Sequence, residues 1–262
     1  MDIMEVIRGR KSFRTFDGRM VSDEDRERIS SYAAAIRNPY GIPVEFVMLD
    51  AEEHGLSSPV IRGERLYVAA KVPRVDHCEE AYGYSFEMMV LYAWSLGVGT
   101  TWMGGTLNRE LFEKAANTGG DEFMMIASPL GYPSPDRSDV DVRLRSKVRG
   151  DERLPASELF YENDFSSPLN SCEDWVEAVR WAPSAANLQP WRIVISGSVY
   201  HFYEKHCLGY TRQMGWDVQK IDLGIALCHF MKVAGGRLLI EDPGIAVEED
   251  MEYIASVDKR AD

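Results

Sequence analysis

The 262-residue sequence has few cysteines and none of the spacings that would make them a framework. Its four cysteines show no C-x-x-C pair, so we expect reduced, apolar side chains instead of disulfides or a zinc site: Cys78, Cys172, Cys207 and Cys228. Three of them have a histidine as neighbour, but adjacent side chains point apart on a strand or a helix. No metal site is therefore expected.

Long apolar runs are also missing. No stretch approaches the ~18 consecutive apolar residues of a membrane span, and residues 1–16 contain no apolar core of a targeting segment. Positive charge is in deficit, because the net charge is -13 at pH 7. An acidic protein lacks the basic face that nucleic acids and anionic membranes require. We expect a cytoplasmic protein that binds neither nucleic acid nor membrane.

Ten of the 29 lysines and arginines lie in two short runs. The first comprises Arg8, Arg10, Lys11, Arg14 and Arg19, and the second comprises Arg143, Arg145, Lys147, Arg149 and Arg153. Two basic runs on an acidic protein can converge on one small anionic ligand, or they can be two solvated loops. The sequence leaves both interpretations open.

The order of predicted elements indicates two related halves, residues 1–160 and a shorter second half, residues 161–262, with an acidic tail. In each half a helix precedes two strands and a helix that is apolar nearly all round: residues 22–36, 43–49, 66–72 and 82–96, then 173–182, 190–196, 199–204 and 221–234. A single buried strand is predicted over residues 122–132. The fold class is α+β, with a central, mostly antiparallel sheet in each half and the apolar helices packed at the centre.

Two segments carry side chains suited to a flat anionic ligand. In an extended turn, Arg10, Ser12 and Arg14 project to one side and could bind a phosphate. Far along the chain, the loop from Pro183 to Pro190 offers small residues that let a ring approach the backbone, and two amides for its polar edge: Ser184, Ala185, Ala186, Asn187 and Gln189. An ordinary basic turn and an ordinary helix-to-strand connection are the alternatives.

A glycine-rich segment, residues 96–106, follows the first apolar helix and can bring backbone N–H groups close to a ligand. It is not a dinucleotide fingerprint, because it follows a helix and not a strand. With Arg-x-Ser-x-Arg-x-Phe, Leu-Gly-x-Gly-Thr-x-Trp-x-Gly-Gly, Gly-Tyr-Pro and Ala-Pro-Ser-Ala-x-Asn-x-Gln-Pro-Trp-Arg, the sequence resembles the nitroreductase family of FMN-dependent oxidoreductases over most of residues 1–236. More narrowly, it resembles the branch that folds two such halves in one chain.

The resemblance implies one composite flavin site. In ordinary members of the family, the arginine segment and the Pro-Ser-x-x-Asn segment come from the two subunits of a homodimer. Here the first half keeps Arg10–Arg14 but has residues 36–41 where its own Pro-Ser motif would stand, and the second half shows the reverse loss. We therefore expect a monomeric pseudo-dimer with a single flavin; further dimerisation is left open.

The resemblance also implies residue roles. The phosphate, ribityl chain and pyrimidine edge would be bound by Arg10, Lys11, Ser12 and Arg14, with Arg14 at the N1/O2 side. Met103, Gly104 and Gly105 would run past N5 and O4, and the ring would be lined by Pro183, Ser184, Ala185, Asn187 and Gln189. Arg153 matches a late phosphate-binding position, although Asp151 stands where a lysine is common; Lys147 or Arg149 could substitute.

The implied activity is oxidoreduction by two-step hydride transfer. NADH or NADPH would reduce bound FMN, and a nitroaromatic, a quinone or a similar conjugated small molecule would accept the electrons. No catalytic side chain is expected, because the chemistry takes place on the flavin. Loops near Tyr40, Phe202 or Tyr210 are the candidates for substrate choice. The alternatives are a non-catalytic protein that binds FMN or a related planar anion, and a flavin reductive dehalogenase.

Overall fold

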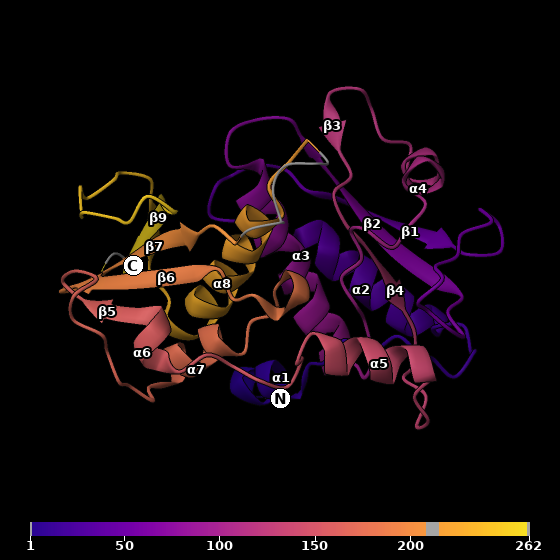
Figure 1. Cartoon of the computed structure of the whole chain (residues 1–262). Helices are drawn as coiled ribbons and strands as arrows, with labels where there is room; N and C mark the ends of the chain where they lie inside the picture. The colour runs from indigo at the N-terminus through magenta and orange to yellow at the C-terminus, as the bar shows by residue number, and fades with distance from the viewer. Residues whose placement is uncertain (1, 208–214, 261–262) are drawn as a thin grey trace. The chain divides into compact units, whose positions relative to one another are not determined.

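The structure is a computed structural model that describes residues 2–207 and 215–260. The chain forms two compact units (Figure 1). The first comprises Gly9–Cys78 and Ser85–Arg149; the second comprises Asp2–Arg8, Glu79–Tyr84 and the residues from Gly150 on. The predicted division into two related halves at residues 160 and 161 stays a prediction.

The first unit is built on an antiparallel sheet in which the long strand β2 pairs with three others. Its strands are β1 (Glu45–Asp50), β2 (Leu66–Pro73), β3 (Glu122–Phe123) and β4 (Ala127–Leu130). Its helices are α2 (Asp23–Ala35), α4 (Arg109–Ala115), α5 (Asp139–Lys147) and the greater part of α3 (Cys78–Ser95). A core of buried residues from these elements includes Leu49, Tyr67 and Phe112.

The second unit has a sheet of five strands in the order β5-β6-β7-β9-β8, of which only the β5–β6 pair is parallel. These are β5 (Phe160–Glu162), β6 (Trp191–Ser196), β7 (Val199–Lys205), β8 (Arg237–Leu239) and β9 (Met251–Asp258). The helices are α1 (Ile3–Gly9, up to Arg8), α6 (Ala156–Leu159), α7 (Asp174–Arg180), the short 3-10 turn η1 (Ala185–Asn187) and α8 (Val218–Ala234). Helix α8 packs against α7, β6 and β7 (Figure 1).

Local signals in the sequence account for most of these elements, so the α+β prediction is confirmed. The Ser22 side chain accepts a hydrogen bond from the Asp25 N–H, at 3.1 Å, and so caps α2 at its predicted start. Gly97 has the left-handed conformation predicted for the end of α3, with φ of 79°. Helices α3 and α8 are largely buried, as their apolar composition predicts.

Two expectations are corrected. Residues 122–132 do not form one strand, because the Arg109 guanidinium binds the carbonyls of Met124 and Met125 and takes them out of the sheet between β3 and β4. The acidic tail, in which no element is predicted, contributes β8 and β9. Strand β9 lies between β7 and β8 and buries Ile254, Ala255 and Val257. In residues 2–207 and 215–260, none of the helices combines the length and apolar character that crossing a bilayer requires.

The first turns of α3 and the start of α8 approach so closely that only glycine fits. A Cβ atom added at Gly83 would lie 2.0 Å from the carbonyl oxygen of Ile221, and one at Gly224 would lie 2.1 Å from that of Glu80. Each glycine thus faces a carbonyl three residues before the other. Such reciprocity is what a two-fold relation between two helices produces, and it is consistent with the internal duplication, which stays a prediction.

We predict that Gly83→Ala and Gly224→Ala each destabilise the protein by about 1–3 kcal/mol, because the added methyl group meets backbone atoms that cannot rotate away. Gly120→Ala is the control, since a Cβ atom there meets nothing within 4 Å. Thermal unfolding measures the effect. A melting temperature equal to that of the control variant would show that the two helices can separate without cost.

Candidate functional site

The first unit brings two of the predicted motifs side by side. Ser12 forms a parallel bridge with Thr100, and the Phe13 N–H donates to the Thr100 carbonyl at 2.8 Å. The arginine turn is therefore held along the glycine-rich segment by backbone hydrogen bonds. Gly99 in that segment is needed for packing, because a Cβ atom there would lie 2.9 Å from the Phe13 ring and from Pro133.

Arg10 is the most buried cation of this turn. Its side chain is 5% exposed, and its Nε atom lies 3.6 Å from Oε1 of the fully buried Glu87. This Nε atom has no hydrogen-bond partner. Burial lowers the pKa of Arg10, the Glu87 carboxylate raises it, and the guanidinium of Arg145 lowers it. Arg10 thus retains a donor that an anion could satisfy.

Arg14 lies in the same electrostatic environment. Its Nη1 atom donates to Oδ1 of the buried Asp141 at 3.4 Å, and Arg137 lies 3.8 Å from the other oxygen of that carboxylate. Burial lowers the pKa of Arg14, Asp141 raises it, and Arg145 and Arg137 lower it. Arg145, from the second basic run, thus converges with Arg10 and Arg14 from the first.

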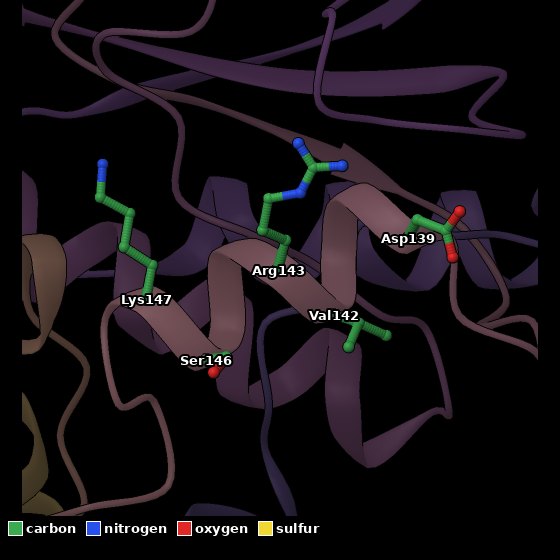
Figure 2. Close-up of a pocket in the computed structure, with 5 residues that line it drawn as sticks. All are labelled: Asp139, Val142, Arg143, Ser146 and Lys147. Atoms are coloured by element: carbon green, nitrogen blue, oxygen red, sulfur yellow. The ribbon is translucent and has the colours of Figure 1, made fainter.

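Two further cations of the second run, Arg143 and Lys147, lie on another face of α5. Helix α5 presents Arg145 and Asp141 to the arginine turn. On its other face, Arg143 and Lys147 lie beside an open pocket (Figure 2). This pocket is also lined by Asp139, Val142 and Ser146. Lys11 is exposed. In the first unit the guanidiniums that converge are therefore those of Arg10, Arg14 and Arg145, with Ser12 beside them.

The three residues predicted to lie along a flavin ring differ in how accessible they are to a ligand. Met103 is buried in the core, and its N–H and carbonyl both bond to Ala127, at 2.9 and 3.1 Å. The Gly104 carbonyl accepts from Arg109 at 3.2 Å. Gly105 is exposed, and a Cβ atom added there would meet nothing within 4 Å. Open backbone is thus found at Gly105, while Met103 supports the segment from within.

In the second unit the Pro183–Gln189 loop has an unusual backbone. Ala186, Asn187 and Gln189 all have positive φ, at 47°, 60° and 52°. Side chains other than glycine adopt this conformation at a cost, and such strain gathers at functional sites. The loop is held by Asp222 of α8, whose carboxylate oxygens accept the Ala185 N–H at 3.1 and 3.0 Å. Ser184 supports it by accepting the Gln189 N–H, at 2.9 Å.

The amides of this loop join it to the segment before α6. Asn187 Oδ1 accepts from Arg153 at 3.3 Å, and its Nδ2 donates to the Glu152 carbonyl at 3.0 Å. Gln189 is buried, and its Oε1 accepts the Leu154 N–H at 3.0 Å. The structure thus brings the predicted Arg153 and Asn187 together. Gln189, with Nε2 donating to the Asn187 carbonyl at 3.2 Å, holds the loop and has no exposed edge for a ligand.

The loop candidates for substrate choice fare differently. Tyr40 is half-buried and stacks on His77 with ring centroids 5.5 Å apart. Phe202 is fully buried in β7, so its assignment to a substrate loop is wrong. Tyr210 lies outside the described residues.

Sequence reasoning missed Asp222, Glu87 and Arg109. The first two carried a signal, because each is an acid within an apolar helix, a place where charge is rarely buried without a partner.

Comparison with known proteins gives one family and a related fold. The family model described as "Putative TM nitroreductase" matches residues 2–234. A putative nitroreductase from Thermotoga maritima is 21% identical, with a TM-score of 0.62, over 98% of this chain and 94% of that one. An FMN-dependent nitroreductase from Clostridium difficile is 16% identical, with a TM-score of 0.45, over 53% of this chain and 93% of that one. No curated protein matches the sequence.

We predict that Gln189→Ala lowers the free energy of unfolding by about 1–3 kcal/mol, since it leaves the Leu154 N–H without its buried acceptor. Hydrogen exchange at the Leu154 amide should accelerate at the same time. The exposed amide variant Asn170→Ala serves as control. Unchanged exchange at Leu154 would mean that Gln189 does not hold this segment in solution.

Proposed function

Since the chain belongs to the nitroreductase family that this model describes, we propose that it is an FMN-dependent oxidoreductase. NADH or NADPH donates the electrons, and a nitroaromatic, a quinone or a similar conjugated small molecule accepts them. The observation that carries this proposal is the arginine turn bonded along the glycine-rich segment, with Arg10, Arg14 and Arg145 converging there.

The residues of the first unit fit an anionic cofactor. Arg10 pairs with Glu87, Arg14 and Arg137 pair with Asp141, and Arg145 lowers the pKa of both Arg10 and Arg14. The mutual repulsion of these guanidiniums and the unsatisfied Arg10 Nε atom would both be relieved by a phosphate or by the electron-rich edge of a flavin. When bound, FMN supplies a ring that accepts a hydride from a nicotinamide and passes electrons on to the acceptor.

The chain's own contribution is to bind and orient. Arg10, Lys11, Ser12 and Arg14 bind the phosphate, the ribityl chain and the pyrimidine edge, and the backbone at Gly104 and Gly105 approaches the ring without side chains between. In the second unit, Pro183, Ser184, Ala185 and Asn187 line the ring, and Arg153 adds a cation. We infer from the sequence that one flavin needs both groups of residues, because the first half keeps only the arginine motif and the second half keeps only the Pro-Ser motif.

We expect the purified protein to be yellow, to be bleached by NADH or NADPH without oxygen, and to recover its colour when a nitroaromatic or a quinone is added. Absorbance spectra follow each step. A colourless protein that does not take up added FMN would refute the proposal. A yellow protein that neither nucleotide bleaches would be a binding protein, and re-oxidation by halogenated aromatics alone would indicate a reductive dehalogenase.

Two variants test the site residues separately. Arg14→Lys keeps the charge beside Asp141 but loses the planar guanidinium, and Asn187→Gly tolerates the φ of 60° but loses the amide. We expect each to reduce bound flavin on the order of 10-fold, as the loss of a hydrogen bond to a charged or edge group does. Arg143→Ala and Asn170→Ala are the matched controls. Full flavin content in either test variant would remove that residue from the site.

A further inference from the structure

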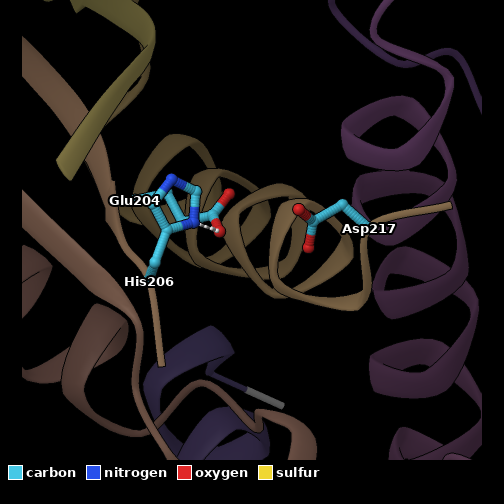
Figure 3. Close-up of side chains that lie close together, drawn as sticks. All are labelled: Glu204, His206 and Asp217. Atoms are coloured by element: carbon cyan, nitrogen blue, oxygen red, sulfur yellow. Dashed lines mark ion pairs between the residues drawn. The ribbon is translucent and has the colours of Figure 1, made fainter. Parts of the chain in front are cut away.

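Strand β7 and helix α8 bring together three side chains that can ligate a metal ion. Glu204 is the last residue but one of the strand, His206 follows the strand, and Asp217 precedes the helix (Figure 3). One ligand atom from each lies within 4.8 Å of the others. Within residues 2–207 and 215–260, this is the one group of three or more such side chains that could hold an ion.

Glu204 is the feature that points to a ligand. Its side chain is fully buried, and neither carboxylate oxygen has a hydrogen-bond partner. The His206 Nδ1 atom lies 2.7 Å from Oε1, but the contact lacks hydrogen-bond geometry. A buried carboxylate without hydrogen bonds is costly. Two ligand atoms this close to one another are placed to share a cation.

The surrounding structure fixes the other two donors. The Gln219 side chain accepts the Cys207 N–H at 3.0 Å and donates to the Lys205 carbonyl at 3.4 Å, so it holds the backbone on both sides of His206. Asp217 Oδ1 caps α8 by accepting the Gln219 N–H at 2.9 Å. Gln219 thus links the residues around His206 to the residue that caps α8.

The charge around the group is strongly negative. Burial, followed by the Asp217 charge, raises the pKa of Glu204 to about 8; Lys220 lowers it, while Glu252 and Glu80 raise it. Lys220 is held by Glu252 at 2.9 Å. Acids thus outnumber the cations that face Glu204, and a divalent ion would reverse that imbalance.

We propose that Glu204, His206 and Asp217 form a binding site for a divalent transition-metal ion such as Zn²⁺. Imidazole and carboxylate donors together suit this class of ion, whereas Mg²⁺ prefers oxygen ligands only. The half-exposed His206 supplies the route to solvent. This site does not depend on the flavin proposal, since it shares no residue with it.

Titration calorimetry of the full chain with ZnCl2 tests the proposal. We expect saturable binding of one Zn²⁺ ion per chain, because the three donor atoms lie within 4.8 Å of one another. MgCl2 should give no comparable heat.

His206→Gln and Glu204→Gln should each weaken Zn²⁺ binding at least ~10-fold, and His54→Gln, at an exposed histidine, should bind as the original chain does. Circular dichroism and thermal unfolding without metal show whether each variant keeps the fold of the original chain. Zinc binding unaffected by either substitution, or no binding at all, would overturn the site.

Discussion

The close approach of α3 and α8 is the constraint on which the second unit depends. At Gly83 and Gly224 each helix meets a backbone carbonyl of the other, so no side chain can separate them. This contact fixes the first turns of α8. From those turns Asp222 reaches the Pro183–Gln189 loop and Gln219 reaches the residues around the end of β7, while Asp217 caps the helix. One close contact between two backbones thus positions both groups of polar side chains.

In the first unit, a short backbone pairing determines where the charged side chains lie. Ser12 and Phe13 pair with Thr100, and this sets Arg10 against Glu87 while α5 brings Asp141 and Arg145 to Arg14. Arg145 lowers the pKa of both Arg10 and Arg14, so these guanidiniums repel one another. An anion is the natural complement to such a surface, which is why the family assignment and the electrostatics lead to the same proposal.

Buried acids recur at each of these places. Glu87 accepts from Trp102 at 3.2 Å beside Arg10, Asp222 holds the strained loop, and Glu204 lies without hydrogen bonds beside His206. Each interrupts an otherwise apolar element, where its burial costs free energy. The cost is compensated by a cation beside Glu87 and by backbone N–H groups at Asp222. At Glu204, a metal ion would provide the compensation.

Local spacing was enough to locate most elements, because capping residues and apolar periodicity act within a few residues: Ser22 and Gly97 mark helix ends where predicted. Contacts remote in sequence decided the rest. Arg109 interrupts the strand expected over residues 122–132. Strand β9 joins the sheet beside β7, although no local pattern predicted it.

The amino-acid sequence alone determined which side chains could bind a phosphate or a flat ring, and which stretches are apolar enough to be buried. Only the tertiary structure decided which of those groups already have hydrogen-bond partners within the protein. Gln189 and Met103 are committed to distant backbone partners, whereas Glu204, His206 and Asp217 become neighbours across a strand end and a helix start. The physical reason is that a polar group's availability depends on its hydrogen-bond partners, and those partners come from elsewhere in the chain.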